Sequence, residues 1–564
     1  MVKNSEHIIS IYGKYGNQNV VPIFQRSFHD NKKFLKELVE TIIEDMSPYL
    51  HEIKVYHNNE DLSVFNTCLI IDGQHRMVFI SLLVLSICSY CIKHNLNYNF
   101  EEDLYNKVIV NRQYSDERKY RLKLQERDNI AFKICVDNIE SFLNKDFEKF
   151  SPKIQVNEDI LSNIIPSYNY LYSLITETNI DSLYYGVQKI KIKYSELEPT
   201  DNFMRIYRTS NNTTNPNTLD EDVKSILLYG YSKEEVKQNE LYYKYWKHIE
   251  EYFYSNPKKT LFELFLNSFV QYKTRKIRNE NVIKYFNKIE DSPSSCKQSM
   301  IEISEYFELF KQFYEADLDN EILNKILLFL NPYMNSFIFS VLITLYELSD
   351  KVEVESLFER VESHIFRNAV INSANTEAIR QVFNLERLHS AYNLSNELET
   401  QIKYSDYYVD DESFKKGFLN FNSGTSHIKQ RQQRHALVRI CQFMSGDEDF
   451  NYNNTSLEHI NPQKPKKYPN NMSVEEYENK YCYTFKNLTL IPMRYNSKLK
   501  NKEFKIKRDL EKYGYKYSKM EINSHLSNYE DFNKSEMEDW GNYLFRIALK
   551  IWNYGEDSQQ SKLM

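Results

Sequence analysis

Glycine and proline are scarce in this chain, and their scarcity constrains its fold more than any other feature. The 564 residues include 11 Gly and 13 Pro. Turns and chain reversals draw on these two residue types, so long stretches with few of them favour helices. Residues 236–446 hold few of either, and their apolar residues recur every three or four positions. We therefore expect a mainly helical α+β protein.

The length of the chain predicts several domains, because a single hydrophobic core rarely serves so many residues. Strand and helix patterns alternate in an N-terminal α/β domain, which we place at residues 1–235. A helical middle domain is expected at 236–446. The C-terminal domain is expected at 447–564, beginning at the polar stretch Gly446-Asp447-Glu448-Asp449.

Cysteine usage and hydropathy indicate a soluble, cytoplasmic protein with no membrane partner. The seven cysteines are scattered and odd in number, unlike a secreted disulfide framework. Cys88 and Cys91 form a single CxxC in an apolar run, which favours a buried thiol pair on a helix over a zinc ribbon. The chain does not begin like a signal peptide, and the run Met77–Ile87 is too short to span a bilayer.

The strongest chemical signal lies between residues 455 and 513. Thr455–Ile460 has a strand pattern, Phe485–Ile491 a second one, and Tyr495 to about Tyr513 a helical one. This β-β-α order brings a carboxylate, an imidazole and an amide together, as a one-metal phosphodiesterase of the His-Me finger (HNH) kind requires. The expected roles are Glu458 and Asn496 as ligands of Mg²⁺ or Mn²⁺, His459 as general base, and Asn487 as the residue that holds the His459 ring.

A local reversal of charge follows this motif. The whole chain has a net charge of −7, but residues 486–519 contain eleven Lys or Arg and three acids, a local charge of +8. Basic residues beside a nuclease centre are suited to phosphate contacts, and we expect them at Lys486, Lys498 and Lys500. A solvated, lysine-rich helix face is the alternative interpretation.

A second motif lies in the N-terminal domain. Cys68–Ile71 predicts a buried strand, Asp72-Gly73-Gln74-His75-Arg76 a turn, and Met77–Ile92 an apolar helix. A glycine turn before a helix presents backbone N–H groups that can bind phosphate. The alternative is an ordinary strand-to-helix turn, capped by Asp72 and with Arg76 in a salt bridge.

Together the motifs resemble the GmrSD-type family, the modification-dependent (type IV) restriction endonucleases of bacteria and archaea. Leu457–Gln463, Asn487–Leu490 and Asn496–Leu499 are similar to the nuclease domain of that family. Pro22–Arg26 and Ile71–Arg76 are similar to its partner domain. The two sets stand in the family's order, and the resemblance spans nearly the whole chain.

The resemblance implies a ParB/sulfiredoxin-like N-terminal domain that binds and hydrolyses a nucleoside triphosphate. It also implies a C-terminal ββα-metal nuclease domain with flanking helices, acting on DNA that includes modified phage DNA. The residues expected at the nucleotide are Asp72, Gly73, Gln74, His75 and Arg76. Gln25 and Arg26 are expected at a phosphate or in a DNA-sensing pocket.

Two departures from the family pattern bear on function. His75 stands where the family's DGQQR motif has Gln, and Lys486 stands where Gly usually precedes Asn487. Neither removes a proposed catalytic group, so we expect an NTP-dependent DNA endonuclease of anti-phage defence. Two alternatives are a nucleotide-dependent DNA-binding or regulatory protein with an inactive nuclease domain, which Lys486 supports, and a toxin-like nuclease acting on host nucleic acid. Whether the chain forms a homo-oligomer is left open.

Overall fold

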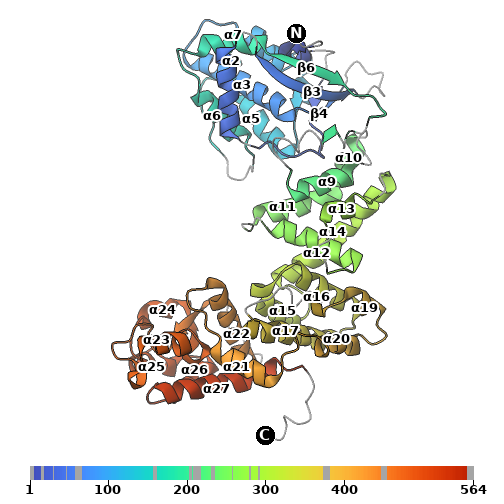
Figure 1. Cartoon of the computed structure of the whole chain (residues 1–564). Coiled ribbons are helices and arrows are strands. Elements are labelled where there is room, and N and C mark those ends of the chain that lie inside the picture. Colours follow the sequence, from blue (N-terminus) through green and yellow to red (C-terminus); the bar gives the residue numbers. More distant parts are fainter. Residues whose placement is uncertain are drawn as a thin grey trace. The chain divides into compact units, whose positions relative to one another are not determined.

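A computed structural model gives the chain two compact units (Figure 1). The described residues are 5–13, 18–29, 31–45, 48–57, 67–156, 162–201, 203, 206–207, 217–229, 235–256, 258, 260–277, 281–289, 292–372, 381–445 and 454–554. The N-terminal unit comprises Met1–Ser255 and Phe286–Ile301, and the C-terminal unit comprises Asn256–Tyr285 and Glu302–Met564. Helices predominate and strands are few, which confirms the expected mainly helical α+β class.

The N-terminal unit is built on a six-stranded mixed sheet with the order β1-β6-β3-β4-β2-β5. Its centre is the antiparallel pair β3 and β4, while β6 runs parallel to β3, and β2 runs parallel to both β4 and β5. The strands are β1 (Ser5–His7), β2 (Gln18–Val20), β3 (Tyr49–His57), β4 (Thr67–Asp72), β5 (Leu122–Lys123) and β6 (Lys191–Glu196).

Helices cover this sheet, as its parallel connections require (Figure 1). The apolar helix α3 (Gln74–Lys93) follows directly from β4 and packs against α5, α6 and α7. The others are α1 (Ile8–Gly13), α2 (Lys32–Glu44), α4 (Asn106–Val108), α5 (Glu126–Leu143), α6 (Ile164–Ser173) and α7 (Ile180–Lys189).

Helix α3 is the core of the N-terminal unit. It is longer than the predicted apolar run, and by length and composition alone it would suffice to cross a membrane. However, 89% of its most apolar 18-residue window is buried inside the fold, as in the core helix of a globular domain. Cys88 and Cys91 are free and buried on this helix, which confirms the predicted thiol pair.

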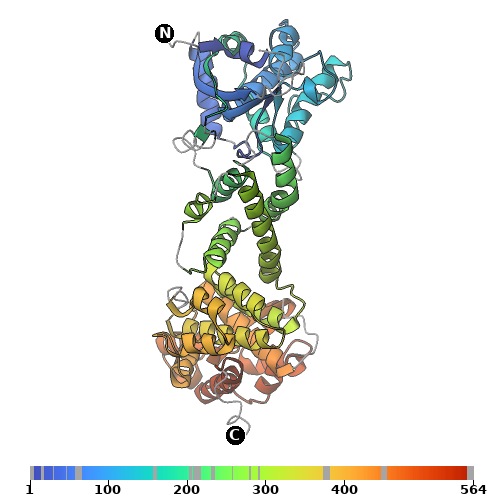
Figure 2. The ribbon, with the colours of Figure 1, turned by 90° about the vertical axis from the view of Figure 1, so that its right-hand side faces the viewer.

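Helices make up nearly all of the described chain from residue 219 to 445 (Figure 2). Helix α9 is Leu219–Tyr229, and the helical pattern of the middle region is confirmed. The division between the two units passes through α13 and α14. These helices are α9, α10 (Glu235–Leu241), α11 (Lys247–Ser255), α12 (Leu261–Thr274), α13 (Val282–Phe286), α14 (Pro293–Glu315), α15 (Glu321–Leu330), α16 (Ser336–Leu348), α17 (Glu353–Asn372), α19 (Leu385–Ser390), α20 (Leu394–Lys403), α21 (Asp411–Asn420) and α22 (His427–Ser445).

The end of the C-terminal unit surrounds a two-stranded antiparallel sheet, β7 (Thr455–His459) and β8 (Leu488–Pro492). Helix α22 packs on both strands, and α27 (Lys534–Ile551) packs on the turn η9 (Phe485–Asn487) that precedes β8. The remaining elements are η7 (Pro469–Asn471), α23 (Val474–Tyr477), η8 (Glu478–Cys482), α24 (Met493–Leu499), α25 (Phe504–Asp509), η10 (Tyr515–Tyr517) and α26 (Glu521–Leu526).

The predicted helix from Tyr495 to Tyr513 is wrong in extent. It is two short helices, α24 and α25, because the chain turns at Lys500, whose φ is +45°. The local β-β-α order, β7-β8-α24, is present as expected. The ParB/sulfiredoxin-like and ββα-metal assignments stay predictions, as do the domain boundaries, and the boundary at 446–449 lies outside the described residues.

Candidate active site

The two short strands and the helix after them bring Glu458, His459 and Asn496 to one cavity. Glu458 pairs with Thr489 and His459 with Leu488 in the β7–β8 ladder, so both candidate residues lie at the end of β7. Asn496 comes from α24, which contacts both strands. The cavity has a volume of about 310 Å³ and is lined by Ser423, Gln430, Leu457, Glu458, His459, Gln463, Asn496, Lys500, Asn501 and Lys507.

Glu458 is a buried carboxylate with a buried cation beside it. The Lys507 ammonium lies 2.6 Å from Glu458 Oε1, and neither side chain is more than 6% exposed. Burial raises the pKa of Glu458, and the charge and hydrogen bond of Lys507 oppose that rise. Burial lowers the pKa of Lys507, which Glu458 opposes in turn. Each charge thus offsets part of the desolvation free energy that burial of the other one costs.

His459 is placed to act as a neutral imidazole. Its ring stacks edge-on against Tyr483 with the centroids 5.6 Å apart, and Gln463 Nε2 lies 3.4 Å from the ring nitrogens. Burial and the nearby Lys507 charge lower the pKa of His459 to about 4. At neutral pH the ring is therefore uncharged and keeps a nitrogen lone pair that can accept a proton.

Asn487 has a different role from the predicted one. The prediction that it holds the His459 ring is wrong, because its fully buried side chain binds the turn after β7 instead. Asn487 Oδ1 accepts from the Asn461 N–H at 2.8 Å, and Nδ2 donates to the Asn461 carbonyl at 3.1 Å. The Asn487 carbonyl accepts from the Ile460 N–H at 2.9 Å. Asn487 therefore fixes the chain immediately after His459.

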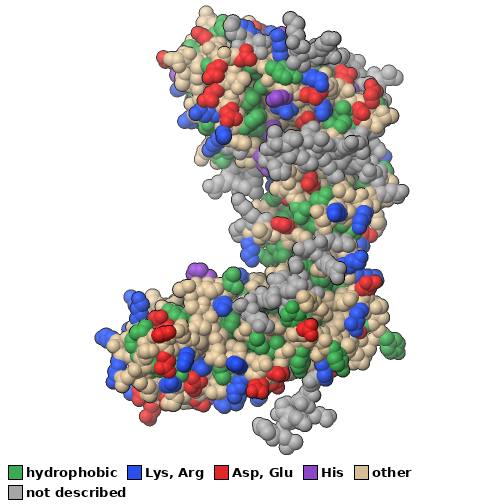
Figure 3. All heavy atoms as spheres, in the orientation of Figure 1, with side chains coloured by type: hydrophobic (Ala, Val, Ile, Leu, Met, Phe, Trp, Pro, Cys, Tyr) green, Lys and Arg blue, Asp and Glu red, His purple; other side chains and the backbone are tan. Residues whose placement is uncertain are grey.

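Lys486 also lies away from the cavity. Its ammonium pairs with Glu538 Oε1 at 2.9 Å, its side chain is 9% exposed, and its stem packs against Gly541 of α27. The phosphate contact predicted for Lys486 is thus not supported by its position. Lys500 is exposed and lines the cavity, and Lys498 is exposed on α24. In Figure 3, further Lys and Arg side chains are scattered over the end of the C-terminal unit that carries α23–α25.

The donor set of the cavity fits a hard divalent cation. Among the described residues, no group of three or more His, Cys, Asp or Glu forms a metal site. A cation here would therefore depend on the Glu458 carboxylate, the Asn496 amide oxygen, and oxygens of water and substrate. Mg²⁺ favours few protein ligands of this oxygen type and keeps several waters.

The N-terminal motif forms a compact turn whose polar side chains largely bind one another. Gly73 has φ +98° and starts α3, where a side-chain cap is absent. Gln25 is buried and donates to the carbonyls of Ile70 and Ile71, the latter at 3.1 Å. Gln74 donates to the Arg26 carbonyl at 3.2 Å. The structure thus joins Gln25 and Arg26 to the predicted nucleotide-binding turn, with both side chains buried.

Arg26 and His75 are the polar centre of this turn. Arg26 Nε donates to His75 Nε2 at 3.1 Å, so that nitrogen carries no proton. Burial, together with the Arg26 charge, lowers the pKa of His75 to about 3. Arg76 turns to the Glu52 carbonyl on β3, and Asp72 ends β4 half-buried. Nucleotide binding at Asp72–Arg76 and DNA contact at Gln25 and Arg26 stay predictions.

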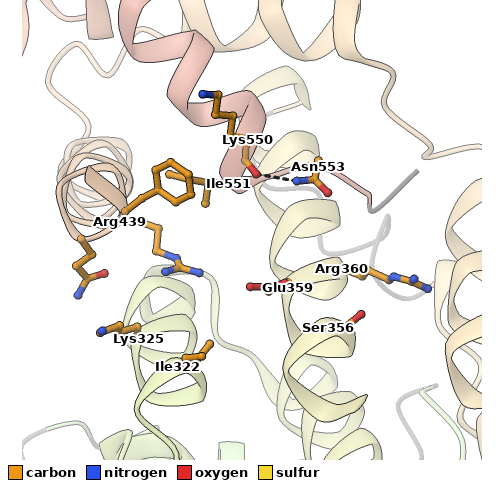
Figure 4. A pocket seen from close by; sticks show the side chains of 11 residues that line it. Ile322, Lys325, Ser356, Glu359, Arg360, Arg439, Lys550, Ile551 and Asn553 are labelled. Carbon is orange, nitrogen blue, oxygen red and sulfur yellow. Dashed lines mark hydrogen bonds between the residues drawn. The ribbon is translucent and has the colours of Figure 1, made fainter. Parts of the chain in front are cut away.

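A further cavity of about 290 Å³ lies between α15, α17, α22 and α27 (Figure 4). Arg439 and Glu359 reach towards it in Figure 4. Arg439 is paired with Glu362, with Nε 3.0 Å from Oε1, and Lys325 is paired with Glu321 at 2.8 Å. The lining includes no histidine, so this cavity lacks the base that a phosphodiesterase centre of the predicted kind needs.

The part of the chain that lines the cavity is similar to a known family of restriction endonuclease domains. Residues 408–547 match the family model described as GmrSD restriction endonucleases, C-terminal domain. This match confirms the resemblance to the GmrSD-type family for the part of the chain that holds β7, β8 and α24. It begins before the predicted start at 447 and includes α21 and α22, which pack around the strands and α27. No curated protein matches the chain.

Proposed function

We propose that this chain is a metal-dependent DNA endonuclease of anti-phage defence and that the cavity at His459 is its catalytic centre. One observation carries the proposal: the adjacent residues Glu458 and His459 and the distant Asn496 line one cavity, within the region that matches a restriction endonuclease domain. Each supplies one function that phosphodiester hydrolysis needs.

In this proposal His459 takes a proton from the attacking water, as its neutral ring allows. Glu458 and Asn496 hold Mg²⁺ or Mn²⁺, which when bound stabilises negative charge on the phosphate. Lys500 lies exposed at the same cavity and is placed to contact a substrate phosphate. Asn487 keeps His459 in position through the turn at Asn461.

The N-terminal unit supplies control in the same proposal. The glycine turn and the start of α3 present backbone N–H groups suited to the phosphates of a nucleoside triphosphate. We infer that this domain senses modified DNA and turns over nucleotide in the cytoplasm, and that the helical region relays its state. The inactive-nuclease alternative loses its support, because Lys486 packs against Gly541 and pairs with Glu538 without displacing Asn487.

The test is a cleavage assay with the full chain on modified and unmodified phage DNA, with Mg²⁺ or Mn²⁺ and each nucleoside triphosphate. We expect His459→Ala to reduce cutting by about a hundredfold or more while nucleotide hydrolysis continues, because only the base is lost. His389→Ala, on α19 and outside the cavity lining, is the matched control. Unimpaired cutting by His459→Ala would exclude His459 from the mechanism.

A further inference from the structure

Lys507 is a cavity residue to which the proposed reaction gives no role. Its side chain is 1% exposed, and its ammonium lies 2.6 Å from Glu458 Oε1. The same ammonium donates to the main-chain carbonyl of His459 at 2.6 Å. One cation therefore joins the carboxylate of the proposed metal ligand to the backbone of the proposed base.

The fold holds this ammonium in place through close packing. Lys507 lies on α25 with Phe504, and both side chains are buried, so α25 turns these two positions towards the interior. A Cβ at Gly514 would lie 2.6 Å from the Lys507 carbonyl and 2.5 Å from the Arg508 carbonyl. Only glycine at 514 permits this approach, which keeps α25 against the chain before η10.

A metal ion bound at Glu458 would be repelled by the Lys507 ammonium. Lys507 already neutralises Glu458, and a divalent ion on the same carboxylate would lie next to a buried positive charge. At such separations the repulsion is large even in a moderately polar medium. Substrate phosphate brings compensating negative charge and oxygen ligands, so DNA would strengthen metal binding here.

We propose that Lys507 is a positioning residue that acts as the internal counter-ion of Glu458. It holds the carboxylate and the end of β7 in place before metal binds, and it weakens metal binding until DNA is present. This inference rests on the proposed function, since it takes Glu458 as a metal ligand. Under this inference the site binds its metal ion tightly only when DNA is bound as well.

The experiment measures Mn²⁺ binding to the full chain by titration calorimetry, with and without a short uncleaved DNA duplex. The variants are Lys507→Met, Glu458→Gln and the double variant. Lys505→Met is the matched control, because Lys505 lies on the same helix but is 59% exposed and pairs with the exposed Asp531. Thermal unfolding without metal reports whether each variant folds, and the double variant removes both charges together.

We expect Lys507→Met to bind Mn²⁺ about tenfold or more tightly than the unaltered chain in the absence of DNA. DNA should then improve its Mn²⁺ affinity less than it does for the unaltered chain. Its melting temperature without metal should fall, and Mn²⁺ should raise it further than in the unaltered chain. The double variant should recover stability and lose Mn²⁺ binding. Lys505→Met should match the unaltered chain in each measurement.

Two results would overturn the inference in distinguishable ways. If Glu458→Gln abolishes Mn²⁺ binding but Lys507→Met binds with unchanged or weaker affinity, Lys507 is not a competing counter-ion, and the proposed function stands. If no variant, Lys507→Met included, binds Mn²⁺ through Glu458, the metal centre itself is wrong and the inference falls with it.

Discussion

The side chain of Asn487 forms a pair of hydrogen bonds with the main chain of Asn461, two residues after His459. Oδ1 accepts from the Asn461 N–H at 2.8 Å and Nδ2 donates to the Asn461 carbonyl at 3.1 Å. A side-chain amide has the same donor and acceptor as a peptide group, so Asn487 acts here like one more residue of a strand pair. Its nature as an amide is therefore required.

Asn487→Asp tests this requirement, because it keeps the acceptor and loses the donor. We expect the free energy of unfolding to fall by about 1–3 kcal/mol, since the buried Asn461 carbonyl loses one of its two donors, keeps only the Tyr477 hydroxyl at 3.3 Å, and faces a carboxylate. Cutting should fall as the chain after His459 loosens. Urea unfolding and the cleavage assay measure the two effects. Asn420→Asp is the control, because Asn420 is exposed and donates only to the Lys416 carbonyl within its own helix.

Lys486→Met separates a structural lysine from a phosphate contact. The methionine keeps the apolar stem against Gly541 and removes the ion pair with Glu538, which is 39% exposed. We expect stability to change by less than about 1 kcal/mol and the salt dependence of DNA binding to stay the same. Lys500→Met, at the cavity, should instead reduce the salt slope by about one. The measurement is the DNA affinity of each variant at several salt concentrations. A smaller salt dependence for Lys486→Met would show that Lys486 contacts a phosphate as first predicted.

His75→Gln should make the free energy of unfolding of the N-terminal unit less dependent on pH below neutrality. Burial and the Arg26 charge lower the pKa of His75 to about 3. The unfolded chain takes up a proton there below about pH 6.5, and the folded chain does not. Stability from this group is therefore complete above pH 6.5 and declines as the pH falls towards 3. Glutamine, the residue of the family motif, can accept from Arg26 and does not titrate.

The measurement for His75 is calorimetric unfolding of both proteins at pH 7.5 and 4.5. Below pH 6.5 the unaltered chain should lose free energy of unfolding relative to the variant. The difference should grow by about 1.4 kcal/mol for each pH unit, down to the pKa of His75 in the folded chain. His94→Gln, at the exposed end of the same helix, should change neither value. If the free energy of unfolding falls with pH equally in His75→Gln and in the unaltered chain, the His75 ring takes up its proton in the folded chain as well.

Helix positions were predictable from sequence where apolar residues recur every three or four positions and glycines or prolines are few. The middle region follows that pattern, and the structure has helices there, such as α15 and α16. The break at Lys500 was not predictable, because a lysine gives no local signal for positive φ. Short strands such as β5 depend on pairing with distant residues, so their extent cannot be read locally.

The candidate site was predictable as a set of residues but not as a network of contacts. Glu458, His459 and Asn496 line one cavity, as their order suggested. The role of Asn487 depends on how the turn at Asn461 folds back, which spacing does not reveal. Lys507 was missed because it stands among exposed lysines. Its spacing of three from Phe504 was the one available signal that it points inward.

Gly73→Ala tests two reasons for glycine in the turn of the N-terminal motif: its positive φ and the close approach of Ile53. The residue has φ +98°, and a Cβ there would lie 2.8 Å from Ile53 Cγ1 and 3.3 Å from Ile53 Cα on the neighbouring strand. Gly424 also has a positive φ, +47°, but a Cβ there would meet nothing closer than 3.8 Å. We expect Gly424→Ala to cost about 1 kcal/mol from backbone strain alone. Gly73→Ala should cost more, about 2–4 kcal/mol, because strain and overpacking add. Thermal unfolding compares the two, and equal losses would mean that Ile53 moves aside and that the backbone conformation alone demands glycine at the start of α3.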